Sequence, residues 1–153
     1  MTDYFQGVVA EYLRADRSVF VNSEILIQLD PGLSPRKGRF WYCDLLAVSM
    51  RERVAYLCEV TYASSVSSLI ARLRAWQTHW AELRSALERD CSIESSWHVA
   101  PWVFLPESRR ETYERKLSLL APFELSSMPE PKVTVLEDVV PWKYRTWDRQ
   151  PDV

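Results

Sequence analysis

The stretch "WYCDLLAVSMRERVAYLCEVTYA", from Trp41 to Ala63, contains two apolar runs separated by a short charged break. Both runs are rich in β-branched and aromatic residues, which is typical of strands. The pattern predicts strands at Phe40–Val48 and Val54–Tyr62, joined by a tight turn. Each run holds a single acid, Asp44 in the first and Glu59 in the second. Two acids in otherwise buried strands require a physical explanation.

The position of the turn decides whether the two acids meet. A turn centred between Arg51 and Glu52 places Asp44 directly opposite Glu59 on one face of an antiparallel pair. Facing Cβ atoms lie about 4.5–5.5 Å apart, and like charges there are destabilising. A raised pKa, a basic neighbour or a bound cation must offset the repulsion. Because Mg²⁺ and Mn²⁺ prefer oxygen ligands, the pair predicts a divalent metal site.

Two alternatives to the metal site remain open at this point. A register shifted by one residue would place the acids on opposite faces of the sheet. The acids could also pair with arginines, or face solvent at a sheet edge.

Hydrophobic periodicity predicts the other elements. The predicted helices are Asp3–Ala15, Val66–Leu87 and Glu107–Leu120, and the predicted strands are Val19–Leu29, Trp97–Leu105 and Lys132–Val140. The order α-β-β-β-α-β-α-β indicates a mixed α/β sheet flanked by helices. Its first three strands form a meander, and the long helix returns the next strand parallel to the third. We expect a single domain over residues 1–153, with a core at 3–121 and a C-terminal strand and aromatic tail at 122–153, packed through Trp142 and Trp147.

Composition narrows the class of protein. The formal net charge is −2 and no apolar run is long enough to span a bilayer, so we expect no contact with membranes. Three cysteines without paired ligand spacing indicate a reduced, cytoplasmic setting and argue against a zinc site. With three glycines and no glycine-rich phosphate loop, nucleotide binding of the P-loop kind is disfavoured. Seven tryptophans are compatible with a tryptophan-rich surface that forms a homodimer or joins a larger complex.

The order α-β-β-β-α-β over roughly the first 105 residues, with Asp44 in the second strand and Glu59-Val60-Thr61 in the third, resembles the PD-(D/E)XK nuclease superfamily. The resemblance implies a restriction-endonuclease-like fold and cleavage of phosphodiester bonds with Mg²⁺ or Mn²⁺. It implies that Asp44 and Glu59 are metal ligands and that the Val60 carbonyl adds a third. Glu11, on the first helix, matches a position where some members place a further acid.

One departure from the family concerns charge. The third-strand motif of the family ends in a lysine that helps to activate the attacking water, whereas this chain has Thr61. A threonine can hydrogen-bond a water but carries no charge. Arg72, Gln77 and Lys37 are candidates to supply the missing function. The RecB-like branch has a tyrosine four residues after such a glutamine, and Ala81 occupies that place here.

A basic cluster at Arg36, Lys37 and Arg39 precedes the strand of Asp44 and is a candidate for phosphate contacts with nucleic acid, expected to be DNA. The leading hypothesis is therefore a metal-dependent nuclease. The alternative is a catalytically inactive protein of the same fold, acting as a binding module or a subunit of a larger assembly. A third hypothesis is a metal-independent enzyme in which Asp44 and Glu59 act as an acid/base pair.

Overall fold

The computed structural model of the protein describes residues 4–62, 65–146 and 151. Along the chain these residues form α1 (Tyr4–Arg14), β1 (Val19–Gln28), β2 (Phe40–Ser49), β3 (Val54–Val60), α2 (Ser67–Thr78), α3 (Trp80–Cys91), β4 (His98–Leu105), α4 (Glu107–Leu117) and β5 (Lys132–Val135). Single 3₁₀ turns lie at η1 (Phe123–Leu125), η2 (Leu136–Asp138) and η3 (Pro141–Lys143).

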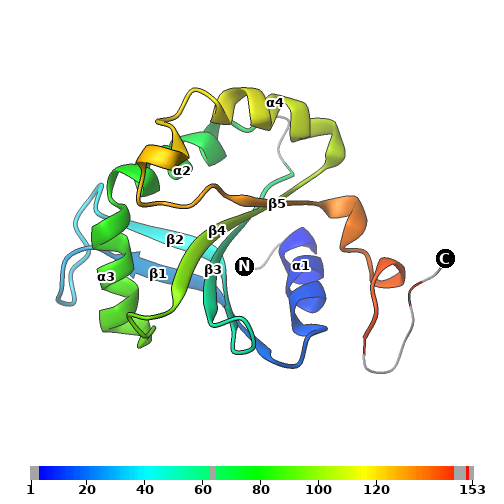
Figure 1. The fold of residues 1–153 in the computed structure, drawn as a ribbon, viewed down its shortest axis with the longest axis horizontal. Coiled ribbons are helices and arrows are strands. Elements are labelled where there is room, and N and C mark those ends of the chain that lie inside the picture. The colour runs from blue at the N-terminus through cyan, green and yellow to red at the C-terminus, as the bar shows by residue number, and fades with distance from the viewer. Residues whose placement is uncertain (1–3, 63–64, 147–150, 152–153) are drawn as a thin grey trace.

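The strands form one mixed sheet in the order β1-β2-β3-β4-β5 (Figure 1). The first three strands are antiparallel neighbours, β4 runs parallel to β3, and β5 runs parallel to β4. The predicted meander and the parallel return after the long helical crossover are therefore confirmed. The fold is a mixed α/β sheet flanked by helices.

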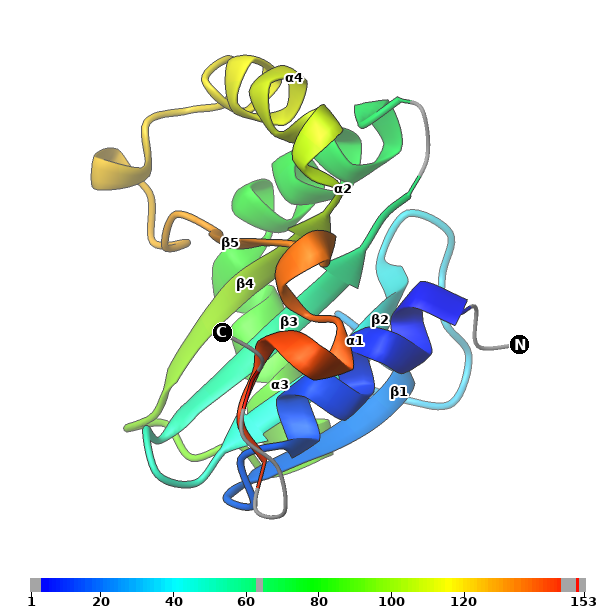
Figure 2. The same ribbon diagram turned by 90° about the vertical axis from the view of Figure 1, so that its right-hand side faces the viewer.

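Helices cover both faces of the sheet. On one face α1 packs Val9 and Leu13 into an apolar cluster with Leu45. On the other face α2, α3 and α4 contribute to a larger cluster that contains Trp76 and Leu57. Figure 2 shows α1 in front of the sheet and α3 behind it. Because both faces are covered, the central strands are buried along most of their length.

The predicted helix over 66–87 is two helices, which corrects the sequence expectation. α2 ends at Thr78, α3 begins at Trp80, and His79 between them has φ −110° and ψ 22°. The Thr78 hydroxyl donates to the carbonyl oxygen of Arg74 at 3.0 Å, a contact that bends helices. The apolar stripe continues across the break, so periodicity alone does not reveal it.

The predicted strand Lys132–Val140 is also shorter than expected, because β5 ends at Val135 and the chain turns into η2. Val139 is fully buried in the cluster beneath α1. Its apolar character therefore reflects packing after a turn, not a continued strand.

The tryptophans lie mainly in the interior. Trp142 is 55% exposed, which corrects its expected packing in the tail, and Trp147 lies outside the described residues. The others are buried or half-buried against the core: Trp41, Trp76, Trp80, Trp97 and Trp102. Among the described tryptophans, Trp142 is therefore the one that is mainly exposed, and the expected homodimer or larger complex stays a prediction. None of the helices among these residues has the length and apolarity that a membrane span requires.

The packing of α3 on the sheet can be tested with Leu83, which is fully buried. Truncation by Leu83→Ala should lower the free energy of unfolding by about 2–5 kcal/mol, because it removes apolar contacts and leaves a cavity. Leu119 is 75% exposed, so Leu119→Ala is the matched control and should change stability by less than about 0.5 kcal/mol. Urea unfolding measures both, and equal shifts in the midpoint would contradict this packing.

Candidate metal centre

Asp44 and Glu59 lie where β2 and β3 stop pairing. The ladder between these strands pairs Ser49 with Val54 at the turn and continues to Leu45 and Cys58. This is the register predicted from the turn. One residue beyond the last pair, Asp44 and Glu59 stand opposite each other.

The two carboxylates cross-link the strands at this point. The Asp44 backbone N–H donates to Glu59 Oε2 at 3.0 Å, and the Val60 N–H donates to Asp44 Oδ2 at 2.8 Å. Each acid therefore satisfies a backbone donor of the opposite strand, in place of the ladder bond that has ended. A buried N–H without a partner would be costly, so both acids have a structural role.

Arg72 of α2 completes the arrangement. Its Nη1 forms a charge-assisted hydrogen bond with Glu59 Oε1 and donates to the carbonyl oxygen of Tyr42 at 3.0 Å. Arg72 was one predicted source of the missing positive charge, and the structure brings it to the acids. A cavity of about 180 Å³ opens here, lined by Asp44, Glu59, Val60, Thr61, Ser68, Leu69 and Arg72.

The surroundings of Glu59 disfavour its charged form. Glu59 is 5% exposed, and burial, followed by repulsion from Asp44, raises its pKa to about 7. Arg72 opposes this shift through its positive charge and its hydrogen bond to Glu59. Burial and the neighbouring carboxylate of Asp44 therefore outweigh the effect of Arg72 on the Glu59 pKa.

The donor set fits a hard divalent cation with few protein ligands. Within residues 4–62, 65–146 and 151, no three His, Cys, Asp or Glu side chains are arranged so that together they could hold a metal ion. Asp44, Glu59 and the Val60 carbonyl supply only oxygens. Mg²⁺ is commonly held by one or two carboxylates and several waters, and Mn²⁺ accepts similar ligands.

The first helix contacts the centre through Gln6, a residue that was not among the predicted site residues. Gln6 is 4% exposed, and its Nε2 donates to the carbonyl oxygen of Asp44 at 3.0 Å. Glu11, the expected acid, is exposed and lies 4.0 Å from Arg14. The inward face of α1 consists of Gln6, Val9, Ala10 and Leu13. A polar residue within this apolar stripe was the signal available in the sequence.

The two other residues predicted to replace the missing lysine, Gln77 and Lys37, do not line the cavity of the acids. Gln77 donates from Nε2 to the carbonyl oxygen of Ala121 at 2.9 Å and lines a separate cavity with Leu125. Its position after the stripe residue Trp76 therefore directs it to the loop after α4. Lys37 lies in the exposed segment 31–38 between β1 and β2, and does not line the cavity of the acids.

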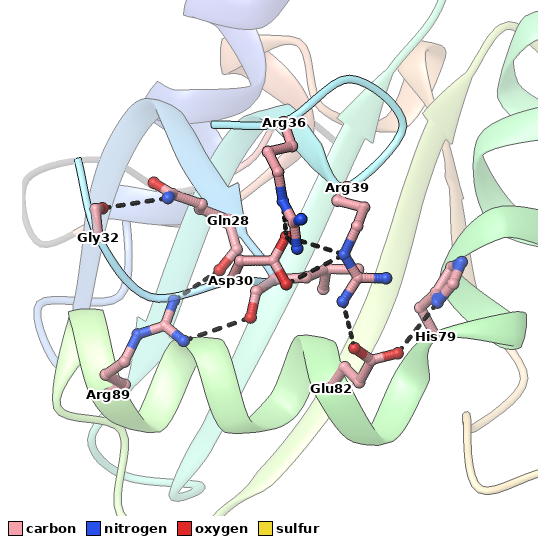
Figure 3. Close-up of polar contacts among 9 residues, drawn as sticks. Gln28, Asp30, Gly32, Arg36, Arg39, His79, Glu82 and Arg89 are labelled. Atoms are coloured by element: carbon pink, nitrogen blue, oxygen red, sulfur yellow. Dashed lines mark hydrogen bonds and ion pairs between the residues drawn. The ribbon is translucent and has the colours of Figure 1, made fainter. Parts of the chain in front are cut away.

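The basic cluster is largely engaged in ion pairs within the protein. Arg39 Nε donates to both carboxylate oxygens of Asp30, at 3.0 and 2.8 Å, and Arg36 Nη2 lies 3.0 Å from Asp30 Oδ2 (Figure 3). Arg39 Nη2 also contacts Glu82 Oε2 of α3 at 2.5 Å. The network ties the loop after β1 to α3. The expected phosphate contacts of Arg36 and Arg39 would have to compete with these acids.

Comparison with family models, with curated proteins and with solved structures finds no match to this chain. The geometry and charge of the described residues are therefore what indicates a function for this chain.

The raised pKa of Glu59 generates a prediction about stability. The folded carboxyl ionises near pH 7, whereas its ordinary value is 4.5. Between these values the folded state binds more protons than the unfolded state, so stability falls as pH rises, by roughly 3 kcal/mol at most. Glu59→Gln removes the ionisable carboxyl and with it this pH-dependent loss of stability. The variant should therefore gain stability relative to the original protein between about pH 5 and about pH 8.

Urea unfolding of both proteins at the two pH values measures the difference. Glu11→Gln is the matched control, because that side chain is exposed, and it should follow the original protein. An equal pH dependence in the original protein and Glu59→Gln would show that Glu59 ionises normally in the folded state.

Proposed function

We propose that the protein is a metal-dependent nuclease of the PD-(D/E)XK type with a restriction-endonuclease-like fold. The observation that carries the proposal is the convergence of Asp44 and Glu59 where β2 and β3 diverge, beneath α2. The arrangement α1-β1-β2-β3, a helical crossover and a parallel β4 supports it. Both the acids and the topology agree with the resemblance seen in the sequence.

The metal would be held by Asp44 and Glu59, with the Val60 carbonyl as a third ligand. A bound Mg²⁺ or Mn²⁺ lowers the pKa of a coordinated water and stabilises the charge that develops on a phosphoryl group. The two carboxylates balance the cation, and burial of Glu59 keeps the site in surroundings where charges interact strongly. Gln6 fixes the backbone that carries Asp44.

Arg72 would take over part of the role of the absent lysine. Its guanidinium is charged at all relevant pH values and carries five N–H donors, of which Nη1 makes the contacts with Glu59 and Tyr42. The remaining donors suit the oxygens of a phosphate. Thr61 lines the same cavity and offers a hydroxyl that can orient a water.

The ion pair between Arg72 and Glu59 also favours a second candidate function. Arg72 neutralises one carboxylate, and Thr61 leaves the third strand without its cation, as expected for a protein of nuclease fold that has lost catalysis and serves as a binding module or subunit. A third candidate, metal-independent acid/base catalysis, draws on the Glu59 pKa of about 7, which suits proton transfer at neutral pH.

Cleavage assays separate these functions. The protein should cut DNA or RNA only with Mg²⁺ or Mn²⁺ present, and Asp44→Asn or Glu59→Gln should lower the rate by at least about 100-fold, because each removes a metal ligand. Glu11→Gln should retain the rate. Cleavage that survives Asp44→Asn and Glu59→Gln, or that persists in EDTA with a bell-shaped pH profile, would overturn the assignment.

Thermal unfolding with Mn²⁺ gives an independent test of the centre. Binding to the folded state should raise the melting temperature, and a metal concentration about 100 times the dissociation constant adds about 2.7 kcal/mol. The rise should disappear in Asp44→Asn and persist in Glu11→Gln. If Mn²⁺ does not change the melting temperature of the original protein and that protein does not cleave nucleic acid, the inactive binding module is favoured instead.

A further inference from the structure

A cavity separate from the candidate metal centre lies between α4 and the segment that follows this helix. Figure 1 shows the segment leaving α4 and returning as β5. The volume of the cavity is about 520 Å³, within the range of about 300–1,000 Å³ that is typical of sites for small molecules. None of its described lining residues also lines the cavity of Asp44 and Glu59.

Apolar side chains form one part of the cavity wall. Leu117 and Leu120 line the cavity and are buried in the core cluster that contains Trp76, and Phe123 packs against the same cluster. Because the core holds these side chains in place, the apolar surface is formed before any ligand binds. A preformed surface of this kind lowers the entropic cost of binding.

Acidic side chains form the polar part of the wall. The charged residues that line the cavity are Arg110, Glu114, Glu124 and Glu130. Arg110 is engaged by its own helix, because its Nε donates to Glu114 Oε1 at 3.2 Å and its Nη1 lies 3.6 Å from Glu107 Oε2. Within the part of the chain that the structure describes, Glu124 and Glu130 form no ion pair. The cavity therefore carries negative charge that the protein does not compensate.

The hydroxyl of Tyr113 lacks a hydrogen-bond partner. The side chain is fully buried and lines the cavity, and its hydroxyl forms no hydrogen bond among the described residues. Burial, followed by the negative charges of Glu130 and Glu114, raises the pKa of Tyr113, so the hydroxyl keeps its proton and lies on the side of these acids. A buried polar group without a partner is unfavourable, so this hydroxyl marks a hydrogen-bonding position that a ligand can fill.

These features select the ligand by its charge and its carbon surface. The carboxylates of Glu124 and Glu130 would repel an anion. A metal ion is disfavoured, because no three His, Cys, Asp or Glu side chains of the described residues could hold one together. A purely apolar ligand would leave the Tyr113 hydroxyl without a partner. An ammonium group on an apolar body meets all three conditions, because it is cationic and donates hydrogen bonds to hydroxyl and carboxylate oxygens.

We propose that this cavity binds a small organic amine, with its ammonium group between Glu130 and the hydroxyl of Tyr113 and its apolar body against Phe123. The protein thus has a ligand site in addition to the proposed nuclease centre. The inference does not depend on cleavage, because no residue that lines the metal centre takes part in it.

The experiment is an NMR titration of the isotope-labelled protein with phenethylamine near pH 7, where this amine, like a lysine, is protonated. The largest changes in backbone amide shifts should fall in α4 and residues 118–133, and the amides of Asp44 and Glu59 should be unaffected. 2-Phenylethanol has a hydroxyl in place of the ammonium and should bind at least about tenfold more weakly, because it lacks the charge. Phenylacetate, an anion of similar size, should not bind.

Tyr113→Phe removes the hydroxyl and keeps the ring. The variant should bind phenethylamine roughly 10- to 150-fold more weakly, the loss expected for one hydrogen bond to a charged group. Without ligand it should be at least as stable in urea as the original protein, because the hydroxyl has no partner to lose. A merely structural role for the hydroxyl would lower this stability and leave the affinity unchanged.

A second pair of variants tests the charge. Glu130 is exposed, so Glu130→Gln should fold normally and weaken the binding of phenethylamine by about 2- to 5-fold. Glu111 lies on α4, is also exposed and does not line the cavity. Glu111→Gln is therefore the matched control and should leave the affinity unchanged.

The outcomes separate this inference from the nuclease assignment. Absence of binding, equal affinity for phenethylamine and 2-phenylethanol, or unchanged affinity in Tyr113→Phe would overturn the inference even if the protein cleaves nucleic acid. Shift changes that are largest at Asp44 and Glu59 would assign the amine to the metal centre and overturn it as well. Selective binding that depends on Tyr113 and Glu130 would support the inference whether or not the protein is a nuclease.

Discussion

The structure of the centre depends on the exchange of hydrogen bonds between Asp44 and Glu59 across β2 and β3. Where two strands part, their backbone N–H groups need new acceptors, because burial without a partner is costly. Carboxylates satisfy these donors and also bring negative charge into the opening. The same oxygens therefore stabilise the divergence of the strands and line the cavity that the divergence creates. A change to either acid affects both, so structural and chemical effects must be separated by isosteric amides.

The placement of α2 follows from this constraint. The buried carboxylate of Glu59 needs a positive partner, and Arg72 supplies it while also holding the Tyr42 carbonyl. The break at His79 then lets α3 continue along the sheet, where Glu82 contacts Arg39 of the loop before β2. Charges that look like a nucleic-acid patch in the sequence thus serve to join the loop to α3 (Figure 3).

The register of β2 and β3 was predictable because the turn fixes which residues face each other, and the apolar residues on both strands leave little freedom to slip. The parallel return of β4 followed from the handedness of crossovers. Side-chain partners were not predictable, because they come from distant segments. Arg39 is paired by Asp30 and Glu82, and no local pattern indicates this. Gln6 is the exception, since its place in the apolar stripe of α1 marked it as inward-facing.

The positively charged side chain at the centre is an arginine, Arg72, and not a lysine, which limits the proton transfers that the centre can carry out. A lysine can lose its proton when buried and so take part in proton transfer, whereas the guanidinium of Arg72 stays protonated. Thr61 contributes a hydroxyl without charge. Arg72 can then hold Glu59 and bind phosphate oxygens, but it cannot accept a proton from an attacking water. Of the side chains that line the cavity, only Asp44 and Glu59 can, and using them as bases conflicts with their use as metal ligands. The proposed hydrolysis would therefore need a water whose pKa is lowered by a bound metal, and a metal-independent reaction would need Glu59 as its base.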